Sequence, residues 1–274
     1  AWLDEHRRGF DVDLKDETCS IASLALQGPT SRVVLEDAMG RDLSEVGFFE
    51  SCVEKLKGVP VQITRTGYTG DLGFEIWCPA ERAVEVWDGV ATAGSPHGLV
   101  PVGLDALDVA RIEAGFVLQG VDYRSSHSCL VDSQRSTPFE VGLGWTVDRT
   151  RLDFVGAAAM EDAAAHPSKA LVGLEVDLEL LEALHEREGL PLEIPPGAHR
   201  DRFVLTRRGS QVGQVTSRAW SPLLKKMLAL GTVSPEWGAL GTRLEMDAWV
   251  DERRVRVAAE VVARPFFDPP RKKA

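Results

Sequence analysis

The chain has 274 residues, enough for one large domain or two domains of ordinary size. Its 44% hydrophobic and 27% charged residues are typical of a soluble globular protein, and no stretch reaches the length of a membrane span. The net charge of −11 argues against general nucleic-acid binding, because that needs a basic surface that displaces counterions. We therefore expect neither a nucleic acid nor a membrane as a partner.

The first half of the chain alternates strand and helix patterns. Residues 20–29 (SIASLALQGP) form a short apolar run that ends at Gly-Pro, which predicts a strand and a turn. Residues 30–40 have helical spacing of apolar residues and a glycine at the end, which predicts a helix. Residues 58–70 alternate like a strand and end in a glycine turn. Residues 73–79 (GFEIWCP) predict a second strand that forms a hairpin with the first across TGDLG.

Two amphipathic helices are predicted next. The first covers residues 80–94, and its buried stripe is expected to contain Val84, Trp87 and Val90 or Ala91. The second covers residues 103–115, with Leu104, Leu107 and Ala110 or Arg111 on adjacent turns. Residues 140–148 (EVGLGWTVD) predict a further buried strand.

The composition changes near residues 161–169. Beyond this point most of the chain consists of short strand patterns separated by turn residues, which indicates a small antiparallel barrel or sandwich. Residues 178–189 (LELLEALHEREG) predict one helix inserted among these strands. We place a domain boundary near Ser168 and expect an α+β fold.

The spacing of cysteine and histidine limits the metal and redox chemistry. The four cysteines (Cys19, Cys52, Cys78 and Cys129) form no C-x-x-C pair, so neither a metal site nor a secreted disulfide framework is expected. The histidines form no H-x-x-x-H pair, so no zinc or iron site is expected either. This pattern favours a reducing, cytoplasmic location.

Glu75 is the unusual residue of the predicted hairpin. It stands between Phe74 and Ile76, and in a strand its side chain points to the opposite face from theirs. One interpretation is that Glu75 faces water, as solitary acids usually do. The other is that it anchors a ligand, because the nearby glycine turns let backbone approach a flat molecule and Tyr68 offers an aromatic face. A carboxylate accepts two parallel N–H bonds, as from a 2-amino-4-oxo-pyrimidine ring.

Several segments resemble, in the same order along the chain, the motifs of the glycine-cleavage T-protein (aminomethyltransferase) family. The hairpin sequence RTGYTGDLGFEI is similar to the family signature R-x-G-Y-T-G-E-x-G-x-E-I. The other matching segments are LALQGP (24–29), GLDALDVARIEAGF (103–116), TPFEVGLGWTVD (137–148), VGQVTSRAWSPLLKKMLALGTV (212–233) and ARPFFDP (263–269). The resemblance spans nearly the whole chain.

The resemblance implies a folate-dependent one-carbon transferase, with folate-binding α/β lobes followed by a C-terminal antiparallel β-barrel. It implies domains at residues 1–160 and 168–274, and lobes around a funnel that holds tetrahydrofolate. Glu75 takes the position of the family's pterin-binding acid, and Tyr68 that of a pocket tyrosine. Phe116 is expected to stack, and Arg264 is the candidate for holding the folate tail.

Three further polar residues, Arg111, Glu113 and Asp122, lie within or just after the helix segment of residues 103–116. Arg111 and Glu113 lie two apart on one helix and do not face each other, so we expect each to be structural and to tie the helix to a neighbouring lobe. Asp122, in LQGVDY, matches the family's Y-G-x-D segment. It is expected either to cap the funnel or to line it as a folate-binding residue.

The departures from the family motifs concern the donor and the catalytic acid. Leu107 stands where glycine-cleavage members have the arginine of A-R-D, and a guanidinium and an isobutyl group are not exchangeable at a polar site. The donor could therefore be an aminomethyl-lipoyl protein or a small N-, O- or S-methyl compound, as in the folate module of dimethylglycine and sarcosine dehydrogenases. The family's catalytic aspartate is expected upstream of Ala1, so the chain resembles an N-terminally truncated member with its catalytic residue unknown. A non-catalytic folate-binding module is the remaining alternative.

Overall fold

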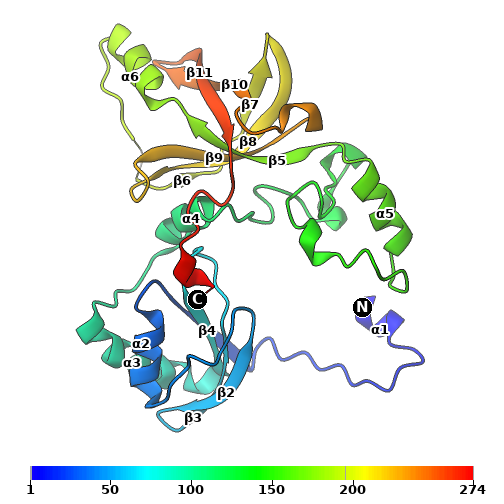
Figure 1. The fold of residues 1–274 in the computed structure, drawn as a ribbon, viewed down its shortest axis with the longest axis vertical. Coiled ribbons are helices and arrows are strands. Elements are labelled where there is room, and N and C mark those ends of the chain that lie inside the picture. The colour runs from blue at the N-terminus through cyan, green and yellow to red at the C-terminus, as the bar shows by residue number, and fades with distance from the viewer. Residues whose placement is uncertain (1, 195, 274) are drawn as a thin grey trace. The chain divides into compact units, whose positions relative to one another are not determined.

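The structure is a computed structural model that describes residues 2–194 and 196–273. The chain divides into two compact units (Figure 1). The first unit contains Ala1–Gly67, Leu72–Pro101 and Arg271–Ala274, and the second contains Tyr68–Asp71 and Val102–Pro270. The domain boundary near Ser168 stays a prediction.

The first unit contains a four-stranded antiparallel sheet with two helices on one of its faces (Figure 1). The strands, in sheet order, are β1 (Ile21–Gln27), β4 (Gly73–Pro79), β3 (Val59–Thr64) and β2 (Ser51–Leu56). The helices are α1 (Trp2–His6), α2 (Ser31–Met39), α3 (Ala83–Gly94) and the short 3-10 helices η1 (Ala80–Arg82) and η2 (Ser95–His97). Apolar side chains of α2, α3 and the sheet form one core, which includes Leu35, Ile63, Phe74, Ile76 and Val86.

The strands predicted over residues 20–29, 58–70 and 73–79 are confirmed, and β3 and β4 pair as the expected hairpin. The predicted end of the helix over residues 30–40 is confirmed. The helix α2 stops at Gly40, which has a left-handed φ of 69° that glycine adopts without strain. The strand β2 was not predicted.

The predicted buried stripe of α3 is wrong for two residues. Val84 is 72% exposed and Trp87 is 51% exposed, whereas Val90 is buried as expected. The helix turns Val86 and Gly89 towards the sheet instead. A Cβ at Gly89 would lie 2.7 Å from Leu56 Cδ2, so the helix approaches the sheet most closely along a small residue, and the tryptophan faces outwards.

The second unit contains helices and loops followed by a closed six-stranded antiparallel barrel. Its helices are α4 (Leu104–Glu113), η3 (Ser126–Ser128), η4 (Asp132–Gln134), η5 (Gly144–Thr146), α5 (Ala157–Ala165), α6 (Leu178–Arg187) and η6 (Pro235–Trp237). The 3-10 helix η7 (Pro270–Lys272) begins at the last residue of this unit, and its other residues are counted with the first unit. The barrel runs through β5 (Ala170–Val176), β9 (Lys226–Val233), β8 (Ser210–Ser221), β7 (Phe203–Arg207), β10 (Arg243–Val250) and β11 (Arg253–Val262), and β11 pairs back onto β5. The two-residue strand β6 (Ala198–His199) adds to β8.

The second unit confirms the expected α+β fold. Its strands close into a barrel and do not form a sandwich. Alternate side chains of its strands fill the interior, among them Leu174, Leu205, Val215, Met246 and Val257, all of which are nearly inaccessible to solvent. The predicted helix over residues 178–189 is confirmed as α6, and the side chain of Asp177 accepts a hydrogen bond of 2.9 Å from the Leu180 N–H at its start.

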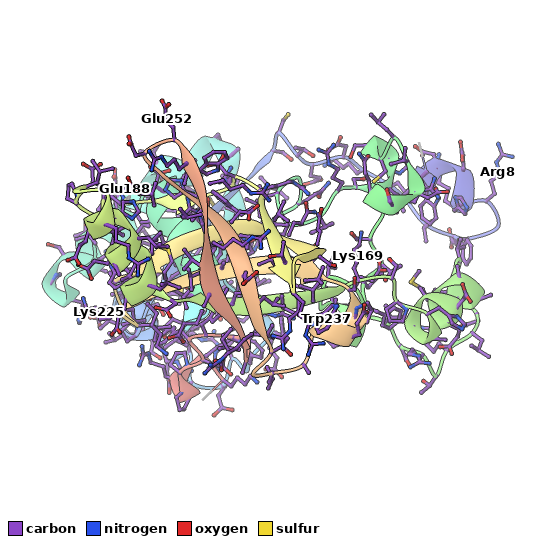
Figure 2. All side chains as sticks on the ribbon, turned by 90° about the horizontal axis from the view of Figure 1, so that it is seen from above. Arg8, Lys169, Glu188, Lys225, Trp237 and Glu252 are labelled. Atoms are coloured by element: carbon purple, nitrogen blue, oxygen red, sulfur yellow. The ribbon has the colours of Figure 1, made fainter. Side chains whose placement is uncertain are left out.

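The buried strand predicted over residues 140–148 is wrong. This segment contains the 3-10 helix η5, and Trp145 is 70% exposed. Most of its backbone bonds are local, such as those from Leu143 N to Pro138 O and from Thr146 N to Leu143 O, and Gly142 has a left-handed φ of 74° that breaks an extended chain. The first residue of the segment is tied to the barrel, because the Leu171 N–H of β5 donates to the Glu140 carbonyl at 3.0 Å. The loop before it is tied as well, because Lys169, labelled in Figure 2 and just before β5, donates from Nζ to the Arg135 carbonyl at 2.5 Å.

Candidate functional site

Glu75 lies in the first unit, on the face of the sheet that α2 and α3 leave uncovered. In the sheet register it pairs with Ala25 of β1 and Thr64 of β3. Its neighbours in sequence, Phe74 and Ile76, are fully buried on the helix-covered face, whereas Glu75 is half-buried. The strand therefore does not bury an acid in the core, because the two-residue period of β4 places Glu75 on the open face.

A series of hydrogen bonds leads to one oxygen of Glu75. Thr66 Oγ1 donates to Glu75 Oε2, and the hydroxyl of Thr64 is 2.8 Å from that of Thr66. The indole Nε1 of Trp77 donates to Thr64 Oγ1 at 3.4 Å. Among the described residues no donor contacts the second oxygen, Glu75 Oε1. The carboxylate is thus held at one oxygen and retains a free acceptor at the other.

Gln27, the glutamine of the LALQGP segment, holds the base of the loop that precedes Glu75. Its Nε2 donates to the carbonyls of Phe74 at 3.2 Å and Thr66 at 3.4 Å. A Cβ at Gly67 or Gly73 would lie 2.0 Å or 2.1 Å from Gln27 Oε1. A side chain at either position would therefore displace the Gln27 amide and disturb its bonds to the Thr66 and Phe74 carbonyls.

The tip of the same loop, Tyr68–Asp71, belongs to the second unit. The Tyr68 hydroxyl donates to the Val117 carbonyl at 2.7 Å, and its ring stacks on Phe116 with centroids 5.5 Å apart. Burial raises the pKa of the Tyr68 hydroxyl. At Gly70 φ is 75°, and a Cβ there would lie 2.6 Å from the Ala114 side chain. The structure thus brings together Tyr68 and Phe116, two of the predicted site residues.

Asp122 is fully occupied by contacts within the second unit. Its Oδ2 accepts from Arg111 Nη1 at 2.6 Å and from the Leu118 N–H at 2.8 Å. Its Oδ1 accepts from Thr216 Oγ1 at 2.5 Å and from Ser217 Oγ at 2.7 Å. As a ligand-binding residue it would have to give up one of these bonds. Its predicted contact with folate stays untested, and the geometry favours the capping alternative.

Arg111 and Glu113 attach α4 to strand β8 of the barrel. Arg111 is 1% exposed and donates from Nη1 to Ser217 Oγ at 3.1 Å as well as from Nε to Asp108 Oδ1 at 2.7 Å. Glu113 Oε1 accepts from Ser221 Oγ at 2.5 Å. These contacts are the kind expected of structural ties between α4 and the barrel, and the structural role of both residues stays a prediction.

Arg264 follows the last barrel strand and is partly buried. Its Nη2 donates to the Leu171 carbonyl at 3.2 Å, and its side chain passes close to two glycines: a Cβ at Gly142 would lie 3.1 Å from Nη2, and one at Gly173 would lie 2.6 Å from Cγ. Burial lowers the pKa of the Arg264 guanidinium, and no carboxylate among the described residues forms an ion pair with it. A desolvated guanidinium without an acidic partner fits an anionic group of a ligand.

Comparison with known families decides what these motifs belong to. A model of the GCVT N-terminal domain matches residues 1–151, and a model of the glycine cleavage T-protein C-terminal barrel domain matches residues 169–268. The chain belongs to the glycine cleavage T-protein family. The glycine-rich hairpin with Glu75 lies in the part matched by the first model, and the barrel in the part matched by the second.

Individual relatives agree with this membership. An aminomethyltransferase from Geobacillus thermodenitrificans is 35% identical over 97% of this chain and 66% of its own length, and one from Streptomyces coelicolor is 36% identical over 97% and 65%. A trimethylamine-oxide aldolase from Ruegeria pomeroyi is 34% identical over 95% of this chain and 31% of its own length. The crystal structure of glycine cleavage system aminomethyltransferase T from Bartonella henselae superposes with a TM-score of 0.71, at 29% identity, over 90% of this chain and 60% of that one.

The chain therefore spans between 31% and 66% of the length of these relatives. No helix among residues 2–194 and 196–273 combines the length and apolarity needed to cross a membrane. The same residues contain no group of three or more His, Cys, Asp or Glu side chains placed to share a metal ion.

Two residues of the site, Gln27 and Thr66, were not predicted from the sequence. Gln27 lies 47 residues before Phe74, whose carbonyl it contacts, so the contact depends on strand pairing. A local signal did exist for Thr66, because Thr64 and Thr66 alternate before the glycine and so share one face of an extended chain. That alternation is too common to indicate a site by itself.

Proposed function

We propose that the protein transfers a one-carbon unit to tetrahydrofolate. The observation that carries this proposal is Glu75: its Oε2 is held by Thr66, while its Oε1 is a free acceptor on an uncovered sheet face. A pterin ring presents neighbouring N–H groups, and a carboxylate pairs with two such groups at once. The residues present therefore fit the ring that the family binds.

The other predicted folate contacts stay proposals of unequal support. The stacked pair of Tyr68 and Phe116 offers an aromatic surface in the second unit. The unpaired guanidinium of Arg264 suits a carboxylate such as that of the folate tail. Asp122 is left out of the proposed contacts because four protein donors already occupy its oxygens.

The chain's own residues would act by binding and orientation. When bound, tetrahydrofolate supplies the amine that accepts the one-carbon unit. Glu75 fixes the ring edge, and the rest of the catalytic advantage would come from holding two reactants in reacting geometry. The Arg111–Asp122 and Glu113–Ser221 contacts keep α4 and β8 rigid, and the loop that bears Phe116 follows directly from α4.

Two donors are proposed for the one-carbon unit. The first is an aminomethyl group on a lipoyl carrier protein, as the aminomethyltransferase relatives suggest. The second is a small methylated amine. It is favoured by Leu107, which is half-buried where a guanidinium is usual in the glycine-cleavage members, and by the trimethylamine-oxide aldolase among the relatives. Single-turnover transfer to tetrahydrofolate from each donor, measured side by side, separates the two.

The experiment that tests folate binding is calorimetric titration with tetrahydrofolate. Glu75→Gln places an amide donor against a ring donor, so affinity should fall about tenfold or more, which corresponds to about 1.4 kcal/mol. Glu45→Gln is the matched control, because Glu45 is an exposed acid of the same unit. Equal affinities of the wild-type and Glu75→Gln proteins would contradict the proposal.

A further inference from the structure

We infer that Thr66 is a positioning residue for Glu75, placed at the end of a directed chain of hydrogen bonds that starts at Trp77 and passes through Thr64. The inference rests on the proposed function, because it assigns to these side chains the task of presenting Glu75 to the ring of tetrahydrofolate. All four residues lie in the first unit, on the open face of the sheet.

The two ends of the chain set its direction. The indole N–H of Trp77 can only donate, and it reaches Thr64 Oγ1 at 3.4 Å. An ionised carboxylate can only accept, so the Thr66 hydroxyl uses its single proton towards Glu75 Oε2. The 2.8 Å contact between the two threonine hydroxyls must then run from Thr64 to Thr66. Each hydroxyl accepts one bond and donates one, so the chain is complete in one orientation.

Thr66 is itself fixed at two points. Its hydroxyl accepts from Thr64, and its carbonyl accepts from Gln27 Nε2 at 3.4 Å. The same glutamine amide bonds the Phe74 carbonyl next to Glu75. Gln27 therefore holds both Thr66, which donates to the carboxylate, and the backbone next to Glu75. This limits the rotamers available to Glu75.

The direction of the chain has a consequence for the ligand. Every hydroxyl proton in the chain points along it towards Glu75, so the free Oε1 meets the ligand as an acceptor with no neighbouring hydroxyl donor. Such an edge favours a ring that presents N–H groups and disfavours one that presents only acceptors, because an unpaired acceptor against a carboxylate is repelled. A 2-amino-4-oxo ring with its adjacent ring N–H has this donor edge.

The first test is a set of threonine variants titrated with tetrahydrofolate. Thr66→Val removes the hydroxyl at nearly constant shape and should weaken binding about fivefold to tenfold, as expected for loss of a hydrogen bond to a charged group. Thr66→Ser keeps the hydroxyl and should bind within about twofold of wild type, and Thr64→Val should have an intermediate effect. Thr232→Val is the matched control, because Thr232 lies on barrel strand β9 without a side-chain hydrogen bond among those found in residues 2–194 and 196–273.

A double-mutant cycle separates positioning from general stabilisation. In the Glu75→Gln background Thr66→Val should cause no further loss of affinity, because the residue acts through the carboxylate. In a protein with Glu75 intact, Thr66→Val should likewise leave the affinity for the 2-deamino analogue of tetrahydrofolate unchanged. Additive losses, or equal losses for both ligands, would overturn the inference.

The second test needs no ligand. The indole N–H signal of Trp77 in an NMR spectrum, assigned by its loss in Trp77→Phe, should move in Thr64→Val and, by a smaller amount, in Thr66→Val, but not in Thr232→Val. An unmoved Trp77 signal in both chain variants would overturn the inference. If Trp77 responds but the wild-type protein does not bind tetrahydrofolate, the proposed function fails while the hydrogen-bond chain stands. If binding is normal and Trp77 does not respond, the chain fails and the function stands.

Discussion

Arg111 and Asp122 form an ion pair in which both side chains are almost completely buried, with Arg111 Nη1 only 2.6 Å from Asp122 Oδ2. The two residues are 11 positions apart, and between them the chain leaves α4 and turns back towards the barrel. Thr216 and Ser217 of β8 donate to the other oxygen of the same carboxylate. Both oxygens of Asp122 are thus hydrogen-bonded, whereas Arg111 Nη2 is buried without a partner among the described residues, and the pair stabilises one arrangement of helix, turn and barrel.

Removing the acid from this pair should destabilise the second unit strongly. Asp122→Ala leaves the Arg111 charge buried with Asp108 as its remaining acidic partner, and the expected loss in the free energy of unfolding is about 3–5 kcal/mol. Urea denaturation measures it. Asp132→Ala removes an exposed partner of Arg135 and should change the free energy of unfolding by less than about 1 kcal/mol. If Asp122→Ala instead kept its stability and lost tetrahydrofolate affinity, Asp122 would be a ligand-binding residue after all.

Gly70 should be intolerant of a side chain for two separate reasons. Its φ of 75° is strained for other residues, and a Cβ would lie 2.6 Å from that of Ala114. Gly58, in the turn between β2 and β3, has a similar φ of 82° but open space around it. Gly58→Ala should therefore cost about 1–2 kcal/mol in backbone strain alone. Gly70→Ala should cost about 1–3 kcal/mol more, because the overpacking adds to the strain.

Thermal and urea unfolding of the two glycine variants give the comparison. Equal losses for Gly70→Ala and Gly58→Ala would show that the loop tip moves away from Ala114 at no cost. In that case the stacking of Tyr68 on Phe116 would also be expected to adjust freely, and the tip would not be a rigid platform.

Glu113 should make the stability of the protein fall as the pH rises. Burial raises the pKa of its carboxyl above the ordinary 4.5, and the hydrogen bond from Ser221 offsets this only in part. The folded protein thus keeps a proton that the unfolded chain has already lost. The contribution to stability is fully present below pH 4.5 and is lost as the pH rises through the folded pKa.

The pH dependence is measured against a variant that cannot ionise. The free energy of unfolding of the wild type minus that of Glu113→Gln should decrease as the pH rises above 4.5. Glu140→Gln is the opposite control. Burial alone would raise the pKa of Glu140, but the hydrogen bonds from Ser168 and Thr137 lower it overall, so its contribution is lost as the pH falls below 4.5. Differences with the same slope for both variants would refute the assignment.

Arg264 is tested through the group it is proposed to bind. Arg264→Met keeps much of the apolar volume beside Gly142 and Gly173 but removes the charge. Affinity for tetrahydrofolate should fall about tenfold, because a charge-assisted bond to the tail carboxylate is lost. Affinity for 6-methyltetrahydropterin, which has the ring but no carboxylate, should stay the same. An equal loss for both ligands would mean that Arg264 supports the fold rather than the tail.

Much of the architecture could be predicted from the chain alone, because it depends on local patterns. The alternation in residues 58–70 and 73–79 identified β3 and β4, and the short strand patterns after Ser168 indicated a small antiparallel barrel or sandwich. Motifs in a fixed order identified the family, since several independent matches rarely occur by chance. The position of Glu75 on a face opposite to Phe74 also followed from the two-residue period of a strand.

Tertiary structure decided the burial and the contacts of side chains whose neighbours are distant in the sequence. Helical periodicity marked α3 as amphipathic, but only the close approach of Gly89 to Leu56 placed Trp87 on the outside. The apolar residues at 140–148 matched a strand, yet the left-handed Gly142 and local hydrogen bonds produced a 3-10 turn. The Oδ1 oxygen of Asp122 is occupied by Thr216 and Ser217, more than ninety positions away, a contact that the barrel strand β8 creates. Likewise, strand pairing and the hydrogen bond from Gln27 bring the Thr66 hydroxyl to Glu75, and no local sequence pattern predicts this contact.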